Sequence, residues 1–219
     1  MIRVGLTGGI AAGKSVAAAQ FEELGIPVID YDELSHAAVA PGTPGLALVT
    51  QTFGEGVLAP DGTLDRALLA QSVFTDEEAR ERLEAIVHPL VIARAQELDA
   101  EAEAAGHKII VHSIPLLVEV AGPEVFDAVI VIDAPADVRV ARLVTGRGMT
   151  EDAAQARIDA QIDDDIRCAA ADVIFDGSGT VENLRSQVDD WATDVLHNGL
   201  DFRPNPERSK FLVTEDALD

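Results

Sequence analysis

The sequence predicts an α/β fold with a doubly wound, five-stranded parallel sheet, and two observations lead to this prediction. Short runs rich in β-branched residues alternate with helical patterns, which is typical of a parallel sheet with helices on both faces. A long stretch without a convincing strand, residues 32–106, follows the second run. It is too long for a simple crossover, so we expect a helical insertion at the open edge of the sheet. The five predicted strands are Ile2–Leu6, Ile26–Asp30, Lys108–His112, Ala128–Ile132 and Asp172–Phe175.

A glycine-rich run of the form GxxxxGKS follows the first predicted strand and leads into a predicted helix, 16–24. Because glycine has no side chain, the backbone N–H groups of such a run can approach phosphate oxygens closely. In this arrangement Lys14 reaches the β- and γ-phosphates of a nucleotide, and the Ser15 hydroxyl ligates Mg²⁺. The sequence therefore predicts a P-loop NTPase-type fold whose phosphate-binding residues are Gly8, Gly9, Ile10, Ala11, Ala12, Gly13, Lys14, Ser15 and Val16.

Amino-acid composition and charge exclude several classes of protein. The 219 residues carry a net charge of −23 and only 4% aromatics, which argues against nucleic acid as a partner because a nucleic-acid binder needs a basic face. Cys168 is the single cysteine, so a disulfide within the chain is excluded. The sequence that begins at Met1 has no signal-peptide pattern. No apolar run approaches the roughly 20 residues that span a bilayer. We therefore expect a soluble, cytoplasmic protein with no membrane partner and a solubilising acidic surface. The oligomeric state is left open.

The predicted insertion contains four helical patterns. A Thr75 N-cap is expected to open the third, and Gly106 is placed to end the last. His88 precedes Pro89, and we expect the proline to make a sharp boundary after the third helix and so to expose the imidazole ring. The four predicted helices are Leu46–Phe53, Asp65–Phe74, Asp76–Val87 and Leu90–Ala105.

A predicted lid follows the fourth strand. The pattern indicates a helix over Pro135–Gly146, a break at residues 147–150, and a second helix from Thr150 that carries Arg157, Gln161 and Arg167. A helix, a glycine-containing break and a second helix are typical of a closing lid, here residues 142–168. Arg142 and Arg147 could neutralise charge on a transferring phosphoryl group. Arg139 is compatible with that role and equally with a solvated surface charge.

Two carboxylates, Asp30 and Asp32, stand at the carboxyl end of the second predicted strand, the edge where ligands bind in such sheets. Asp32 is the preferred acceptor for a proton from an attacking hydroxyl, or a holder of Mg²⁺ through water. Asp30 fits chemistry and the cap of a helix over 33–40 equally well. At the end of the third strand stands Ser113, where many P-loop enzymes have an aspartate. We therefore expect Mg²⁺ to depend on Ser15, the substrate phosphates and Asp32.

With these motifs located, the chain resembles the dephospho-coenzyme A kinase family from Met1 to about Trp191. The P-loop alone is generic, but the Thr7–Ile10 opening, His88-Pro89 and the run Pro115-Leu116-Leu117 with Glu119 are more specific. The resemblance implies a single kinase domain over 1–199 that uses ATP and Mg²⁺. Its substrate would be dephospho-CoA, phosphorylated on the ribose 3′-hydroxyl to give coenzyme A and ADP. The tail, 200–219, is expected to be a frayed end.

The resemblance also implies roles for individual residues. Asp32 would be the catalytic base beside Lys14, Arg142 and Arg147, and 32–106 would be the coenzyme A subdomain. The acceptor would lie near His88, Leu116, Glu119 and Gln161. The chain departs from the family pattern at Tyr31, Ser113, Asp176 and the acidic run 163–165. Two alternatives stay open: another small-molecule kinase of this fold, for nucleosides or shikimate, and a nucleotide-binding regulatory protein with little turnover.

Overall fold

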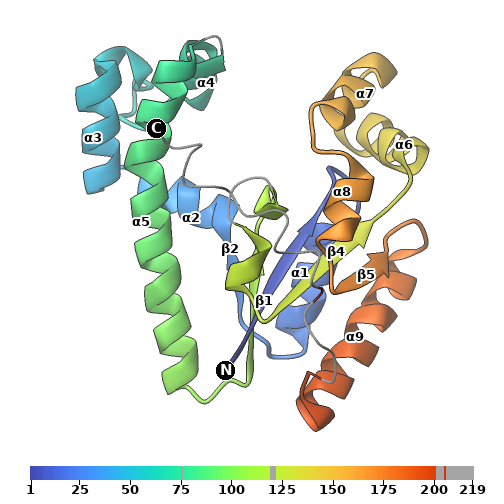
Figure 1. The fold of residues 1–219 in the computed structure, drawn as a ribbon. Helices are drawn as coiled ribbons and strands as arrows, with labels where there is room; N and C mark the ends of the chain where they lie inside the picture. The colour runs from blue at the N-terminus through green and yellow to red at the C-terminus, as the bar shows by residue number, and fades with distance from the viewer. Residues whose placement is uncertain (75, 119–121, 201–204, 206–219) are drawn as a thin grey trace. The chain divides into compact units, whose positions relative to one another are not determined.

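The computed structural model describes residues 1–74, 76–118, 122–200 and 205. Two compact units divide the chain. One consists of Met1–Ile29 with Ala102–Asp219, and the other of Asp30–Glu101. The first contains the sheet and the second is built from helices (Figure 1).

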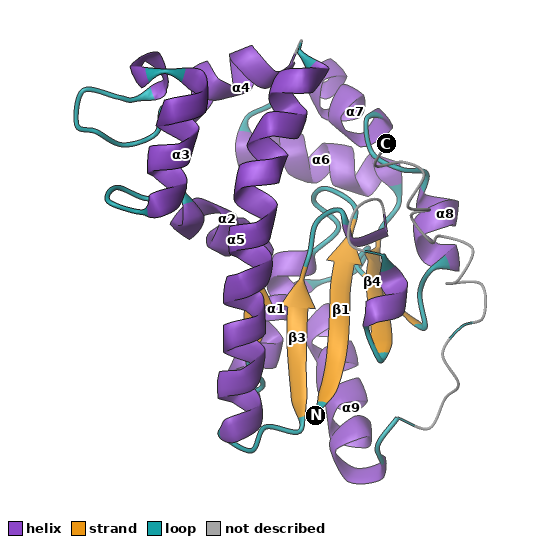
Figure 2. Cartoon of the chain, turned by 60° about the vertical axis from the view of Figure 1, so that its left-hand side comes forward, coloured by secondary structure: helices purple, strands orange, loops and turns teal. Residues whose placement is uncertain are grey.

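The sheet has five strands in the order β2-β3-β1-β4-β5. Strands β3, β1, β4 and β5 run parallel, and the arrowheads of β3, β1 and β4 point the same way (Figure 2). The register sets Leu6 beside Ser113, and Gly8 beside Ile132, so these strands end at one edge. The predicted sheet is confirmed, with small shifts in bounds: β1 (Ile2–Gly8), β2 (Val28–Asp30), β3 (Ile109–Ser113), β4 (Ala128–Asp133) and β5 (Val173–Asp176).

Helices α1 (Lys14–Glu23) and α9 (Val181–Asn198) pack with one face of the sheet into the main core. The rings of Phe21 on α1 and Trp191 on α9 meet edge to face with centroids 5.9 Å apart. On β1 a Cβ at Gly5 would stand 2.5 Å from Leu117 Cδ1 and 2.9 Å from the Phe126 ring. The glycine therefore lets the segment after β3, with the short helix η3 (Pro123–Val125), pack closely on the strand.

Three helices form the region predicted as a lid: α6 (Ala136–Arg147), α7 (Glu151–Asp159) and α8 (Asp164–Ala169). Gly148 ends α6 in the left-handed conformation, and the Thr150 hydroxyl caps α7, so the expected break at this point is confirmed. The single helix expected from Thr150 to Arg167 is wrong. It divides after Asp159, and Asp163 caps the short α8 by accepting the Asp165 N–H.

The helical unit contains α2 (Tyr31–Ala38), α3 (Pro44–Phe53), η1 (Glu55–Val57), α4 (Arg66–Phe74) and most of α5 (Glu77–Ala104). The expected boundary at Pro89 is wrong, because α5, which is 28 residues long, runs through this proline. Proline has no N–H to donate to the carbonyl four residues earlier, yet one lost bond does not end a helix of this length. Thr75 lies outside the described residues; Asp76 Oδ1 accepts the Ala79 N–H at 3.0 Å and so caps α5. Gly106, at φ 82, follows α5 as predicted.

In the predicted tail, the described residue Asn205 forms hydrogen bonds to the end of α8 and to the segment before β5. Its backbone N–H donates to Asp172 Oδ1 at 2.6 Å, and its Nδ2 donates to the carbonyls of Ala169 and Ala171 at 2.8 and 3.0 Å. The tail residues 201–204 and 206–219, which we expect to fray, lie outside the described residues. Among the helices that the structure describes, none combines the length and the low polarity needed to cross a bilayer.

Candidate nucleotide-binding site

The loop between β1 and α1 is tightly folded against β4. A Cβ at Gly8 would lie 2.6 Å from the Ile132 carbonyl oxygen, so only glycine allows this approach. Gly13 has φ 123, and Ala11, at φ 61, is the one non-glycine residue with positive φ in the described part of the chain. Such a conformation costs an L-residue free energy, and residues held in it cluster at active sites and ligand-binding loops. The Ala12 N–H donates to the Gly9 carbonyl at 3.0 Å and closes the turn.

The N-terminus of α1 has the features of an anion-binding site. Gly13 is its N-cap and supplies no side-chain hydrogen bond, while first-turn N–H groups have no acceptor within a helix. Together with the helix dipole, these donors attract phosphate. The Lys14 amine donates to the Ser113 hydroxyl at 2.6 Å, which holds it at the carboxyl end of β3. Ser113 is fully buried and Ser15 is exposed.

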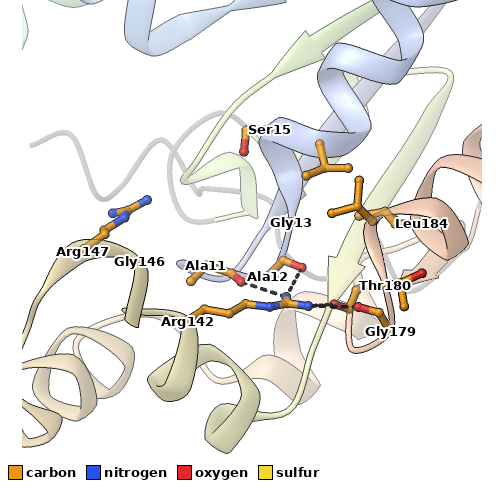
Figure 3. Close-up of a pocket in the computed structure, with 13 residues that line it drawn as sticks. Ala11, Ala12, Gly13, Ser15, Arg142, Gly146, Arg147, Gly179, Thr180 and Leu184 are labelled. Atoms are coloured by element: carbon orange, nitrogen blue, oxygen red, sulfur yellow. Dashed lines mark hydrogen bonds between the residues drawn. The ribbon is translucent and has the colours of Figure 1, made fainter. Parts of the chain in front are cut away.

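Arg142 clamps the loop from α6. Its Nη1 donates to the carbonyls of Ala11 and Ala12, both at 3.1 Å, and its Nη2 donates to Gly177 at 2.6 Å and Gly179 at 3.3 Å. Figure 3 shows the guanidinium spanning the loop and the β5–α9 connection. The guanidinium therefore fixes two backbone segments relative to each other. The predicted contact of Arg142 with a phosphoryl group stays a prediction.

A cavity of about 330 Å³ adjoins this clamp. Cavities of some 300 Å³ or more hold small ligands. Its wall combines loop backbone, apolar side chains of α1 and α9, and two of the three arginines of α6, Arg142 and Arg147, a mixture that suits a flat base and a ribose. Arg147 is exposed at the end of α6 (Figure 3). The lining residues are Ala11, Ala12, Gly13, Ser15, Val16, Arg142, Gly146, Arg147, Gly177, Gly179, Thr180, Val181 and Leu184.

Three residues of the α6–α8 region meet the loop at its other end. The Ile10 N–H donates to Gln161 Oε1 at 2.7 Å. Arg139 and Arg167 are 1% and 2% exposed and share the carboxylate of Asp164. The interpretation of Arg139 as a solvated surface charge is therefore wrong, because its guanidinium is packed between α6, α8 and the loop.

Comparison with known proteins decides the family. The family model described as dephospho-CoA kinase matches residues 2–183. The chain belongs to the dephospho-CoA kinase family. It is 46% identical over 197 residues to a dephospho-CoA kinase of Streptomyces avermitilis, covering 90% of this chain and 95% of the relative. It is 48% identical to one of Cutibacterium acnes, covering 86% of this chain and 82% of the relative.

Solved structures agree with this family. The protein TT1252 from Thermus thermophilus has a TM-score of 0.78 at 30% identity and covers 89% of this chain and 97% of its own. A dephospho-CoA kinase from Campylobacter jejuni has a TM-score of 0.69 at 25% identity, with 90% and 98% covered. A shikimate kinase from Acinetobacter baumannii, at 14% identity and a TM-score of 0.51, is alike in fold alone.

The site residues that the family resemblance implied are distributed over both units. Asp32 is exposed in the first turn of α2, and His88 is exposed on α5; both belong to the helical unit. Leu116 follows β3 in the sheet unit and is 44% exposed. Glu119 lies outside the described residues.

The cap of α2 belongs to Asp30. Its Oδ1 accepts the N–H groups of Asp32 at 2.8 Å and Glu33 at 3.2 Å. The helix therefore begins at Tyr31, two residues before the predicted start. Burial, and to a lesser degree the charge of Asp99, raises the pKa of the Tyr31 hydroxyl to about 12.

Two further expectations concern side chains near the site. Asp176 is fixed by the turn after β5, where hydrogen bonds from Ser178 lower the pKa of its carboxyl group. Burial, reinforced by the charges of Asp133 and Asp164, raises the pKa of the Cys168 thiol to about 11. A thiol with this pKa stays protonated at neutral pH, which is unfavourable for a nucleophile.

Proposed function

We propose that this chain transfers the γ-phosphoryl group of ATP to the ribose 3′-hydroxyl of dephospho-CoA, giving coenzyme A and ADP. Membership of the dephospho-CoA kinase family supports the substrate. One observation supports nucleotide binding above all: Lys14, at the start of α1, has its amine 2.6 Å from the hydroxyl of Ser113 at the end of β3. One ligand with a phosphate chain and a base could use both this amine and the cavity beside Arg142.

The nucleotide would bind with its base and ribose in the cavity and its phosphates along the loop. The N–H groups of Gly13, Lys14 and Ser15 would donate to phosphate oxygens, because the start of α1 offers them no acceptor. Lys14 would exchange its bond to Ser113 for one to a phosphate oxygen. Arg147, exposed at the end of α6, would offset charge on the transferring group.

The residues present fit a magnesium ion in part. The Ser15 hydroxyl is exposed beside the cavity and supplies an oxygen, the kind of ligand that Mg²⁺ prefers. Among the described residues, no three His, Cys, Asp or Glu side chains gather into a metal site. Ser15 and the phosphates would therefore hold the ion, with Asp32 as the further holder through water that the sequence predicts, and the ion would supply neutralisation of phosphate charge.

The acceptor side rests on the helical unit. The new bond would form between the 3′-oxygen and the γ-phosphorus as the bond to the β–γ bridging oxygen breaks. Asp32 would accept the proton of the 3′-hydroxyl, since its carboxylate is exposed and Asp30 performs the capping. We assign the insertion, 32–106, to coenzyme A binding, with His88, Leu116, Glu119 and Gln161 near the acceptor.

The remaining proposals concern organisation. We propose that residues 142–168 close as a lid over the nucleotide, that 1–199 is one kinase domain and that 200–219 is a tail. Since ATP is an intracellular metabolite, we propose the cytoplasm as the location. Nucleic acid has no part in this reaction.

An ADP-release assay tests the proposed function. The purified chain is given ATP and Mg²⁺ with dephospho-CoA, shikimate or a nucleoside in turn, and Lys14→Ala serves as the inactive control. We expect ADP release that depends on dephospho-CoA and is lost in the control. Release that depends on another acceptor would move the chain to a different kinase function. Nucleotide binding without acceptor-dependent release would indicate a regulatory protein.

A further inference from the structure

A buried cluster of three charged residues supports the phosphate loop. Arg139 Nη2 and Arg167 Nη1 donate to the two carboxylate oxygens of Asp164, which joins α6 to α8. Arg139 Nε also donates to the Ala134 carbonyl and Arg167 Nη2 to the Ile162 carbonyl, both at 2.9 Å. Because one carboxylate faces two guanidinium groups, the cluster carries one excess positive charge.

This charge lies directly against Gly9. A Cβ built at Gly9 would clash with Arg139 Nη1 and would stand 3.3 Å from Arg167 Nη1. The missing side chain therefore lets both guanidinium groups approach the loop backbone. Asp163 and Asp165, which flank Asp164, are more open to solvent than the two arginines, so water screens their charges more than it screens the cluster.

The cluster leaves two buried donors unused. In the described part of the chain, Arg139 Nη1 and Arg167 Nε have no hydrogen-bond partner, although each is shielded from solvent. An unsatisfied buried donor costs free energy, and a buried ion cluster is often no more stable than apolar side chains of the same volume. A contribution to stability therefore does not explain why two arginines are buried beneath Gly9. Attraction to an anion bound on the loop does explain it.

The position of the cluster selects one end of the nucleotide. The cavity that suits the base is lined by Ala11, Ala12, Gly13, Ser15 and Val16, but not by Gly9. Gly9 precedes these residues in the loop and does not line the cavity, so a phosphate chain that leaves the cavity along the loop would bring its terminal phosphate toward Gly9. The terminal phosphate is the one that ATP has and ADP lacks.

We propose that Arg139 and Arg167, joined by Asp164, are positioning residues that stabilise the terminal phosphate of ATP electrostatically across the Gly9 backbone. The inference rests on the proposed function, because it assumes a triphosphate in the loop. Its consequence is a preference for ATP over ADP that depends on the charge of the cluster rather than on its shape.

Calorimetric titration of the full chain with MgATP and MgADP, without acceptor, tests the charge. Arg139→Gln removes one positive charge; we expect it to weaken ATP binding about tenfold and ADP binding about twofold or less, since a charge acts most strongly on the nearest phosphate. Equal losses for the two nucleotides would overturn the proposal, because a distorted loop would bind both poorly. Arg185→Gln is the matched control: it removes an arginine that pairs with exposed Glu23 on the surface, and the ATP-to-ADP ratio should not change.

A second variant changes the charge in the opposite direction. Asp164→Asn removes the shared carboxylate, so the cluster gains a positive charge although its hydrogen bonds weaken. We expect the preference for ATP over ADP to rise; a fall would show that the cluster acts only through its structure. Either variant decides the matter alone if the other does not fold. Absence of ATP binding by the unaltered chain would contradict the proposed function itself, whereas unchanged ratios in variants that bind would contradict this inference only.

Discussion

The amide of Ile10 donates to Gln161 Oε1 at 2.7 Å across 151 positions of sequence. This contact joins the phosphate loop to the break between α7 and α8. The loop amide therefore has an acceptor within the protein. We infer that Gln161 holds the first half of the loop in place, as Arg142 holds the second half.

Two substitutions of Gln161 separate the effect of losing the hydrogen-bond acceptor from the effect of adding a negative charge. Gln161→Met has a similar length but no acceptor, and leaving the Ile10 N–H unpaired should lower the free energy of unfolding by about 1 kcal/mol. Gln161→Glu keeps an acceptor oxygen, so its melting temperature should stay near that of the unaltered chain. Its added negative charge beside the loop should nevertheless weaken ATP binding more than the methionine does. Thermal melts and ATP titrations measure both effects. Unweakened ATP binding by the glutamate variant would show that Gln161 is remote from the phosphates.

Arg142 and Arg147 should behave differently although both line the cavity. Arg142→Met removes donors to four backbone carbonyls. The expected loss of unfolding free energy is on the order of 2–4 kcal/mol, together with weaker ATP binding. Arg147→Met removes an exposed side chain and should lower kcat with little change in the melting temperature. Melting curves and steady-state kinetics of the two variants decide this. If the Arg142 variant melts normally, the clamp does not contribute to stability as we describe.

The backbone of Ala11 is strained, so a substitution that relieves the strain should stabilise the folded protein. Its φ of 61 disfavours an L-side chain by about 1–2 kcal/mol, partly offset by the greater freedom that glycine gives the unfolded chain. Ala11→Gly should therefore raise the free energy of unfolding by up to about 1 kcal/mol. Ala12→Gly is the matched control, because Ala12 is buried and does not have a positive φ, so glycine there should destabilise. Equal destabilisation by both variants in thermal melts would contradict strain at Ala11.

Local patterns predicted the sheet and the loop well. Three sequence features were enough to predict local structure: the β-branched runs, the GxxxxGKS spacing and the glycine after α5. Each of them acts through short-range backbone preferences, and the structure confirms the elements that they predicted. Two local rules failed where neighbours outweighed them. Pro89 lies inside a helix whose other bonds keep it continuous, and the helix predicted from Thr150 to Arg167 divides, with Asp163 capping its second part.

The cluster under Gly9 could not be predicted from pattern alone. The burial of Arg139 depends on how α6 packs against α8 and the loop, and an arginine in a polar helix gives no sign of it. One signal was present in the sequence. Asp164 stands three residues before Arg167, the spacing of an ion pair within a helix. The predicted roles of Asp32, His88, Leu116 and Glu119 remain predictions, because they depend on the acceptor.

Asp32 provides the sharpest test of the chemistry, because Asp30, and not Asp32, caps α2. Asp30 caps α2, so Asp32→Asn should leave the melting temperature nearly unchanged. Asparagine cannot accept the proton of the 3′-hydroxyl, and the same change should lower kcat by a factor of roughly 10² to 10⁴. Asp30→Ala is the control with the reverse expectation: the lost cap should cost about 1 kcal/mol of stability. Retained turnover in Asp32→Asn would show that another group accepts the proton. If turnover is lost, a Mg²⁺ titration separates the remaining roles, because activity that returns at high Mg²⁺ indicates metal positioning, whereas activity that stays low supports proton abstraction.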